Sequence, residues 1–295
     1  MQDKLIKAVA RNGNVRIYAL RSTNLVEKAR LQHDLWPTSL AAMGRLLSVT
    51  VMMASMLKEE DHSIIVQLNG GGPIGTCMVQ AYGNGQVKGF VGDNEIYLKY
   101  NESNKLAVGL AVGNQGYLQV TKDMKMKDKF TGQVALQTGE IGDDFAYYFA
   151  VSEQTPSVVS LGVLVDTDYS CKASGGLLIQ LMPNALEEDI VAVEEVVKHL
   201  QPISSLIEEG KSLEDIVTSL FNDAEILESK QVGWHCDCSK DRFKGALSTL
   251  KEEDLIQMIE EDHQAEVKCE YCNTKYIISE EELKFILGFK RSCLK

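Results

Sequence analysis

Two short cysteine clusters near the C-terminus constrain this chain more than any other feature. Cys236-Asp237-Cys238 is separated by thirty residues from Cys269-Glu270-Tyr271-Cys272, and together they hold four of the seven cysteines. Two such pairs, joined by a small folded insert, can bring four thiolates to the corners of a tetrahedron, the coordination that zinc takes in closed sites. Each pair can also close on itself as a disulfide when an oxidant arrives. The sequence therefore predicts a zinc site that is either structural or redox-sensitive.

The N-terminal region gives no sign of export. Residues 1–4 lack the basic flank and apolar run of a secretory signal. The most apolar stretch, residues 36–57, carries Arg45 and several hydroxyl residues, so we expect a buried core helix there rather than a membrane span. We therefore expect a reducing cytosol, where clustered cysteines are more often metal ligands or redox sensors than permanent cross-links.

The net charge of −12 is unevenly distributed along the chain. Acidic and basic residues balance in residues 1–183, whereas residues 184–230 hold twelve acidic and three basic residues. Residues 231–295 hold thirteen acidic and ten basic residues. Nucleic-acid binding normally needs clustered lysine and arginine, so this distribution argues against a nucleic-acid partner.

We interpret residues 1–183 as one α+β core domain. Short apolar runs between turn signals predict strands over residues 5–10, 15–20, 63–69, 75–82, 86–91, 117–121, 132–137, 158–165 and 177–181. Asn84-Gly85 favours a type I′ turn between two of these strands. Helices are expected from Ser22 or Thr23 to about residue 35, from a Thr38 cap to residue 57, and over 141–151. The second helix is apolar on most faces and should therefore be central.

Other motifs of the core domain are better explained by structure than by chemistry. The glycines at 70–72 have no following Lys-Ser or Lys-Thr, so we interpret them as a tight turn rather than a phosphate loop. Paired carboxylates can act as catalytic acids and bases, but no nucleophile with a base lies near them in this sequence. We therefore assign loop and cap roles to Asp143, Asp144, Asp166 and Asp168. Cys77 and Cys171 are expected to be small core residues, and Cys293 an exposed thiol without a set role. No catalytic residue is predicted.

Two further parts follow the core domain. Residues 184–230 show helical spacing at 187–200, 212–221 and 224–227, and their many acids indicate a linker that folds only while docked on a neighbour, or else an ordinary helical arm. Residues 231–295 should form a small zinc-binding module. It would have helices at 242–250 and 252–260, a turn between short strands for the second cysteine pair, and a capping box at Ser279. Few apolar residues are available there, so metal binding should supply much of the folding free energy, on the order of 10–16 kcal/mol.

Several segments of the chain are similar to those of a known protein family. In the core domain they are residues 67–73, 116–123, 131–134, 139–141, 152–156 and 175–180. In the C-terminal module they are the two cysteine pairs, because a Cys-x-Cys with a Cys-x-x-Cys at this distance is much more specific than two Cys-x-x-Cys pairs. With these segments the chain resembles, over essentially its whole length, the thirty-three-kilodalton heat-shock protein family, the redox-activated holdase chaperones of bacteria. Cys77, Cys171 and Cys293 are outside this pattern.

The resemblance implies a cytoplasmic, ATP-independent chaperone of the oxidative stress response, not an enzyme. One Zn²⁺ per chain would be held in the reduced state by Cys236, Cys238, Cys269 and Cys272. Oxidation would pair Cys236 with Cys238 and Cys269 with Cys272, release zinc, and unfold the module and the linker. The activated protein would form a homodimer and hold unfolding client proteins through residues 1–183, without a membrane partner.

Two alternatives stay open at this point. A constitutive zinc-ribbon binding protein would use the metal only structurally, although acidity disfavours its usual nucleic-acid partner. A thiol–disulfide oxidoreductase using Cys269 and Cys272 would need a thioredoxin-like βαβ context, whereas the sequence places this pair on a hairpin. His235 is the one other candidate ligand, and a closed site with four cysteines does not need it.

Overall fold

The structure, a computed structural model, describes residues 2–103 and 105–293, without the side chains of residues 292 and 293. The prediction about the Cys293 thiol therefore lies outside the described residues. Contacts divide the chain into two units, one ending at His235 and the other beginning at Cys236. The first unit mixes sheets and helices, which confirms the α+β class, and the boundaries drawn at residues 183 and 230 stay a prediction.

The five-stranded sheet is antiparallel and joins segments from both ends of the first unit. Its order is β10-β1-β2-β9-β8, with β1 at Lys4–Ala10, β2 at Val15–Arg21, β8 at Ser157–Val165, β9 at Cys171–Leu181 and β10 at Glu225–Gln231. The predicted first hairpin and the two later strands are confirmed. The helix predicted at residues 224–227 is wrong, because this segment pairs with β1 as β10. A free strand edge attracts a partner through backbone groups, which side-chain spacing does not reveal.

The six-stranded sheet has the order β11-β5-β4-β3-β6-β7. Its strands are β3 (Ser63–Asn69), β4 (Cys77–Tyr82), β5 (Gln86–Val91), β6 (Tyr117–Asp123), β7 (Phe130–Ala135) and the two-residue β11 (Gly233–Trp234). The hairpin at Asn84-Gly85 is confirmed, but its turn is not type I′, which needs positive φ at both residues; only Gly85 has one, at 86°. Gly70 and Gly72 lie in the predicted turn, where an added Cβ would meet the backbone of residues 111–113.

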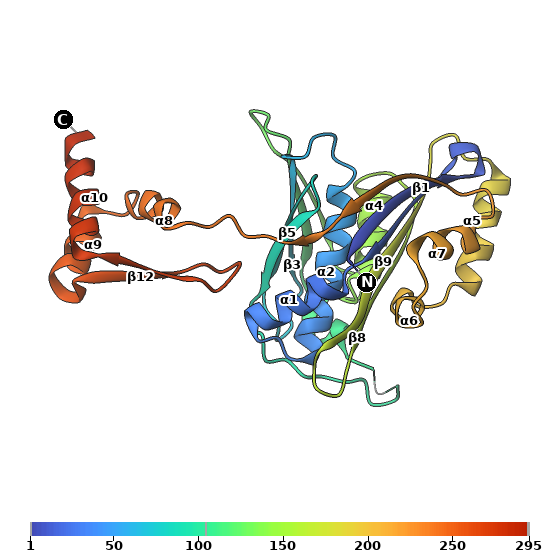
Figure 1. Cartoon of the computed structure of the whole chain (residues 1–295), viewed down its shortest axis with the longest axis horizontal. Helices are drawn as coiled ribbons and strands as arrows, with labels where there is room; N and C mark the ends of the chain where they lie inside the picture. Colours follow the sequence, from blue (N-terminus) through green and yellow to red (C-terminus); the bar gives the residue numbers. More distant parts are fainter. Residues whose placement is uncertain (1, 104, 294–295) are drawn as a thin grey trace. The chain divides into compact units, whose positions relative to one another are not determined.

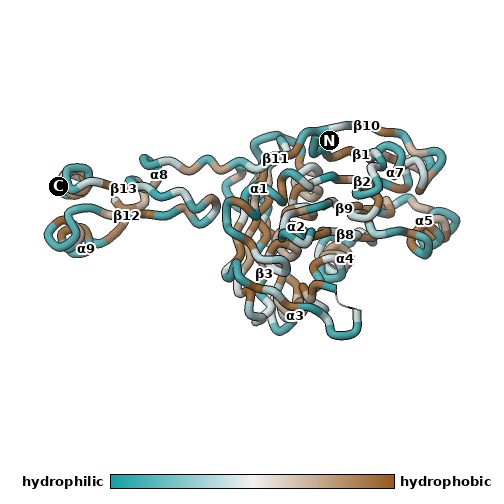
Figure 2. The backbone as a smooth tube through the Cα atoms, turned by 60° about the horizontal axis from the view of Figure 1, so that its bottom comes forward, coloured by the Kyte–Doolittle hydropathy of each residue, from teal (hydrophilic) through white to brown (hydrophobic). Residues whose placement is uncertain are grey.

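Helix α2, Pro37–Ala54, lies between the two sheets (Figure 1) and contacts strands of both. Every residue of α2 except Arg45 is buried, as expected for a helix that is apolar on most faces. The tube in Figure 2 is correspondingly brown where α2 meets the strands around it. Thr38 is not the cap, because Pro37 already begins the helix after Trp36; the Thr38 hydroxyl donates to the Leu98 carbonyl over 2.9 Å instead. Among the described residues, no helix has the length and apolarity to span a membrane.

Three smaller helices complete this part of the first unit. They are α1 (Thr23–His33), α3 (Val108–Val112) and α4 (Gly142–Val151). The predicted helices after Ser22 and over residues 141–151 are thus confirmed, and α4 begins under a cap provided by the buried Asp144.

The helical part of residues 184–230 packs on the face of the five-stranded sheet opposite α2, and the end of this segment joins the sheet as β10. Helices α5 (Glu187–His199), α6 (Ile203–Glu208) and α7 (Leu213–Leu220) cover side chains that alternate along β1 and β2 with those facing α2. The neighbour on which this segment docks is therefore the sheet of the core domain. The buried side chains where these helices meet the sheet are called the linker cluster: Ile6, Ala8, Ala10, Val15, Ile17, Ala19, Ala173, Leu177, Ile179, Val193, Ile203, Leu206, Ile207, Leu213, Ile216, Val217 and Phe221.

The second unit is built around one hairpin. β12 (Gln264–Lys268) pairs with β13 (Lys275–Ser279), accompanied by α8 (Lys240–Leu247), α9 (Glu252–Gln257) with a π turn at Met258–Asp262, and α10 (Glu280–Cys293). The capping box at Ser279 is confirmed: its N–H donates to the Glu282 carboxylate over 2.9 Å, and the Glu282 N–H donates to its hydroxyl over 3.4 Å. The second unit has a small apolar core, which we call the module cluster: Leu247, Leu255, Ile259, Ala265, Ile278, Leu283, Ile286 and Leu287.

Candidate metal centre

The two cysteine pairs lie on segments of different local structure. Cys236 and Cys238 are in the extended segment before α8, which Ser239 caps by accepting a hydrogen bond from the Arg242 N–H over 3.3 Å. Cys269 and Cys272 are on the turn that joins β12 to β13. The second pair thus has the antiparallel hairpin context predicted for it, and not the βαβ context that a thioredoxin-like motif requires.

Backbone hydrogen bonds fix the turn that carries the second pair. The N–H groups of Cys272 and Asn273 donate to the Cys269 carbonyl over 3.3 and 2.7 Å, and the Cys269 N–H donates to the Thr274 carbonyl over 2.9 Å. Asn273 has a φ of 55°, a left-handed conformation that asparagine tolerates. The turn leaves Cys269 and Cys272 buried, with 5% and 6% of their surface exposed.

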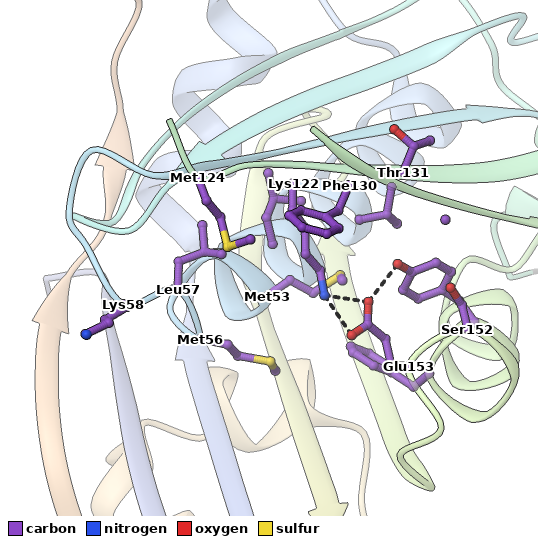
Figure 3. A pocket seen from close by; sticks show the side chains of 15 residues that line it. Met53, Met56, Leu57, Lys58, Lys122, Met124, Phe130, Thr131, Ser152 and Glu153 are labelled. Atoms are coloured by element: carbon purple, nitrogen blue, oxygen red, sulfur yellow. Dashed lines mark hydrogen bonds and ion pairs between the residues drawn. The ribbon is translucent and has the colours of Figure 1, made fainter. Parts of the chain in front are cut away.

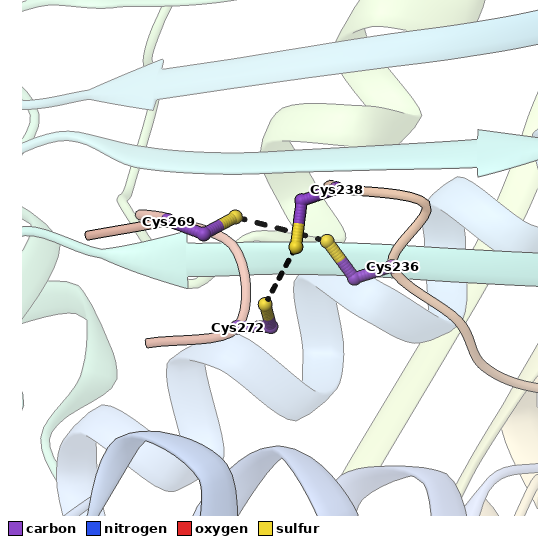
Figure 4. A group of neighbouring side chains, drawn as sticks. All are labelled: Cys236, Cys238, Cys269 and Cys272. Carbon is purple, nitrogen blue, oxygen red and sulfur yellow. Dashed lines mark hydrogen bonds between the residues drawn. The ribbon is translucent and has the colours of Figure 1, made fainter. Parts of the chain in front are cut away.

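The four sulfurs converge, as Figure 4 shows, and all lie within 4.8 Å of one another. The Cys236 and Cys269 sulfurs are 3.8 Å apart, and the Cys238 and Cys272 sulfurs are 3.3 Å apart. Metal–sulfur bonds near 2.3 Å in a tetrahedral site would place the sulfurs about 3.8 Å apart. The residues predicted as ligands are therefore brought together at a spacing that fits an ion of the size of zinc.

The thiols of this cluster affect one another's ionisation. Burial is the main cause that raises the pKa of Cys236 and of Cys269. Burial also opposes ionisation of Cys272, but contacts with Thr274 and with the Cys238 and Cys269 thiols outweigh it and lower the pKa of Cys272 to about 7. The Cys272 thiol therefore ionises before those of Cys236 and Cys269, and a first thiolate makes a second one harder to form, because like charges this close repel each other. A cation in place of these protons would allow all four sulfurs to be anionic.

Tyr276 supports the first cysteine pair, and sequence reasoning did not single it out. Its hydroxyl lies 3.2 Å from the Cys238 sulfur and donates to the Cys238 carbonyl over 3.1 Å, while its ring packs on Phe243 at a centroid distance of 5.2 Å. Contact with Cys238, followed by burial, raises the pKa of Tyr276 to about 12, so the hydroxyl keeps its proton at neutral pH. The available signal was strand alternation, since Tyr276 shares a face of β13 with the buried Ile278.

The other residues that the sequence singled out have structural places. Cys77 and Cys171 are buried in the first unit, and burial raises the pKa of each thiol to about 12, which confirms them as core residues. His235 is not in the four-sulfur group, and its backbone N–H donates to the Val87 carbonyl over 3.0 Å.

The four aspartates take the predicted cap and loop roles. The Asp144 carboxylate accepts from the N–H groups of residues 137, 138 and 141 over 2.7 to 3.0 Å, and Asp143 accepts from the Thr138 hydroxyl over 3.2 Å. Asp166 and Asp168 accept hydrogen bonds from residues of their own loop.

The similarity to known proteins extends over nearly the whole chain. A family model described as Hsp33 protein matches residues 3–279. The 33 kDa chaperonins of Bacillus velezensis and Geobacillus kaustophilus are each 44% identical, over 283 and 286 residues, covering 96% of this chain and 97% of each relative. The crystal structure of the 33 kDa chaperonin (heat shock protein 33 homolog) from Thermotoga maritima has a TM-score of 0.91 at 34% identity, covering 99% of this chain and 100% of that one.

Proposed function

The chain belongs to the Hsp33 family, and from this premise we propose that it is a redox-regulated holdase chaperone that works without ATP. The relatives' names support the chaperone class, whereas the redox regulation is our proposal. The observation that carries it is the group of four sulfurs within 4.8 Å, supplied by two segments that are thirty residues apart in the sequence. We assign the ligands of one zinc ion in the reduced state to Cys236, Cys238, Cys269 and Cys272.

A bound zinc ion would keep the sulfurs deprotonated and would join the Cys-x-Cys segment to the β12–β13 hairpin. Thiolates are the reactive form of cysteine, so ligands of this kind stay open to attack by a peroxide. To form each disulfide, one hydrogen peroxide molecule would accept two electrons from two thiolates. Its O–O bond breaks as the S–S bond forms, and two protons complete two water molecules. Because a disulfide sulfur is no longer a thiolate donor, every pair that forms removes two ligands.

We propose that the disulfides form within the pairs, Cys236 with Cys238 and Cys269 with Cys272. The competing arrangement joins the two segments, since the Cys238 and Cys272 sulfurs are 3.3 Å apart. The two arrangements have opposite consequences. A disulfide between segments would keep the Cys-x-Cys segment attached to the hairpin, whereas disulfides within the pairs let the two segments separate. Peptide mapping of the peroxide-treated protein by mass spectrometry distinguishes them.

The docking site of the linker determines how unfolding of the C-terminal module could affect it. Because α5, α6 and α7 lie on the five-stranded sheet, they do not depend on the C-terminal module for a docking surface. The module is instead connected to them through the chain, by β11, which pairs with β5 over two residues, and by β10 on the edge of β1. We propose that unfolding of the module releases β11 first, then β10, and then the helices.

Release of the helices would uncover the sheet side of the linker cluster, including Ile6, Ile17 and Leu177. An exposed apolar surface of this kind binds other apolar chains, which would be unfolding client proteins. The twelve acidic residues of segment 184–230 would oppose re-docking and keep the complex in solution. We further propose that the activated form is a homodimer and acts in the cytoplasm under oxidative stress, with no nucleic-acid or membrane partner and no catalytic residue.

An aggregation assay with a heat-denatured client tests the proposal. Zinc-loaded reduced protein is compared with peroxide-treated protein, while a chromophoric chelator reports zinc release. We expect suppression of aggregation only after oxidation, in step with zinc release. Cys171→Ala should behave like the wild type, because Cys171 lies outside the four-sulfur group, whereas Cys269→Ser should suppress aggregation without oxidant. Equal suppression by both redox states of the wild type would reject the redox switch.

A constitutive zinc-ribbon binding protein is the second candidate. It is favoured by the module cluster, which gives the second unit an apolar core of its own. If that core suffices, the fold and the client binding should both be insensitive to oxidation, which is the outcome that separates this candidate from the holdase.

A further inference from the structure

The Tyr276 hydroxyl has two acceptors at the first cysteine pair and one proton to donate. It lies 3.1 Å from the Cys238 carbonyl oxygen and 3.2 Å from the Cys238 sulfur. A thiol can meet the hydroxyl by donating its own proton, which leaves the tyrosine proton to the carbonyl. A thiolate can only accept, so the tyrosine proton then turns toward the sulfur. The contact therefore becomes a charge-assisted hydrogen bond when Cys238 is ionised.

The ring of Tyr276 is held independently of its hydroxyl. It packs on Phe243 at a centroid distance of 5.2 Å, and Phe243 lies on α8, the helix that follows the first pair. The backbone of Tyr276 is fixed as well, since this residue pairs with Val267 in the β12–β13 ladder. Tyr276→Phe therefore removes a hydrogen bond and leaves the ring in its place.

The four sulfurs differ in the groups that face them. A side-chain hydroxyl lies near one sulfur of each pair: that of Tyr276 near Cys238, and that of Thr274 at 3.2 Å from the Cys272 sulfur. Backbone N–H groups face the other two sulfurs. The two hydroxyl contacts are thus the ones that a side-chain substitution can remove.

The first pair is the more accessible of the two pairs. Cys236 and Cys238 are half-buried, whereas Cys269 and Cys272 are buried. Oxidation of cysteine follows thiolate character and exposure, so a dissolved oxidant reaches the first pair more easily. The Tyr276 hydroxyl therefore faces a sulfur that is open to attack.

A hydrogen bond has opposite effects on a free thiol and on a metal-bound thiolate. For a free thiol, stabilisation of the anion raises the ionised fraction and so favours oxidation. A zinc-bound sulfur is ionised already, so this gain is absent. What is left is the second effect, which is that a more stable thiolate is a weaker nucleophile.

We propose that Tyr276 is a positioning residue that restrains the reaction of the zinc-bound Cys238 sulfur with a peroxide, and so sets the peroxide sensitivity of the switch. The inference rests on the proposed function, in which the four cysteines hold zinc. In the restrained step the Cys238 thiolate attacks one peroxide oxygen, the O–O bond breaks and hydroxide leaves, which gives a sulfenic acid. The Cys236 thiolate then displaces a second hydroxide to form the disulfide, and two protons convert both hydroxides to water.

Rates of zinc release from full-length, reduced, zinc-loaded protein test the inference, at a fixed peroxide concentration and with a chromophoric chelator as reporter. Tyr276→Phe should release zinc roughly threefold faster than the wild type, because loss of a charge-assisted hydrogen bond strengthens the nucleophile. Thr274→Val removes the other hydroxyl and should have a smaller effect, since Cys272 is buried. Tyr147→Phe, the same chemical change on an exposed tyrosine of the first unit, should have no effect.

Two further measurements separate this role from a purely structural one. Without peroxide, zinc should pass to the chelator at the same rate from Tyr276→Phe and from the wild type, because the ring packing is unchanged. In zinc-free protein, thiol titration should show that peroxide oxidises Tyr276→Phe no faster than the wild type, because the sulfur is no longer held in its ionised form.

Three results would overturn the inference: equal rates of peroxide-driven release, an equal acceleration of zinc loss without peroxide, or faster oxidation of the zinc-free variant. A wild-type protein that holds no zinc would reject this inference and the proposed function together. A wild-type protein that releases zinc to peroxide but never suppresses aggregation would reject the holdase alone, so the two failures are distinguishable.

Discussion

The linker cluster and the module cluster are both small apolar cores outside the central one, and they are held together in different ways. The linker cluster has seventeen buried residues, taken from β1 and β2 near the N-terminus, from β9, and from helices α5–α7 and the residue that follows them. The module cluster has eight buried residues in the described part of the second unit, all within one short stretch of chain. The first core has about twice as many buried residues as the second, whereas the second unit also carries the four converging sulfurs. The stability of the module is therefore the one that, in the function proposed above, depends on the metal and on the redox state of its cysteines.

The linker is nevertheless docked unevenly. Helix α5 contributes only Val193 to the linker cluster, and a cavity of about 500 Å³, lined by residues such as Ile190 and Val197, lies between it and the sheet. A buried carboxylate at its start, Asp189, holds it instead, accepting from Arg11 over 2.9 Å and from Asn14 over 2.8 Å. α6 and α7 supply most of the apolar contacts. Once β10 is released, α5 should be the first helix to leave the sheet.

Removal of the metal should have the largest effect, and it should fall on the module. Small zinc modules gain on the order of 10–16 kcal/mol from their ion, far more than eight buried residues can replace. We expect hydrogen exchange in β12, β13 and α10 to lose its protection when a chelator is added to the reduced protein. Protection of α6 and α7 should decline much less. The two regions would not differ as described if α10 stays protected without metal, or if α7 loses its protection before α10 does.

Truncation of the linker cluster should have an intermediate effect, confined to the other region. Ile216 is 1% exposed, and removal of such a side chain to alanine costs about 2–5 kcal/mol. Ile216→Ala should therefore raise hydrogen exchange in α5–α7 and increase the binding of an apolar dye, while zinc affinity stays at the wild-type value. Thr218→Ala on the exposed side of the same helix is the control. A drop in zinc affinity with Ile216→Ala would mean that the two regions are not separate.

The polar anchor of α5 should have the smallest effect, and it should depend on pH. The Leu186 N–H, together with Arg11 and Asn14, lowers the pKa of Asp189 below its ordinary value of 3.8. Because folding lowers this pKa, the anchor stabilises α5 fully at pH values above the ordinary 3.8. This stabilisation is lost as the pH falls through the lower pKa of the folded protein. Asp189→Asn should expose α5 to proteolysis severalfold faster at pH 7 than in the wild type, and the difference should vanish in strong acid. A difference that is the same at every pH would assign the effect to packing.

Local pattern determined much of this fold and the centre of the candidate site. The apolar faces of residues 37–54 determined a buried helix, the alternation along β1 and β2 determined two covered sheet faces, and the spacing of Cys236, Cys238, Cys269 and Cys272 determined a four-sulfur cluster. Each is set by neighbours in the chain, because helix and strand periods and the turn of a cysteine pair are local geometry.

Long-range contacts decided the rest. Residues 224–227 have helical spacing yet form part of a strand, because the free edge of β1 offers backbone partners more than two hundred positions away. Arg11 and Asp189 form an ion pair although they are 178 positions apart in the chain, and Met53 and Glu153, a hundred positions apart, line one cavity (Figure 3). The contact of Tyr276 with Cys238 likewise depends on how the hairpin meets the first pair. No pattern along the chain encodes such pairings, since the chain must first fold for these groups to meet.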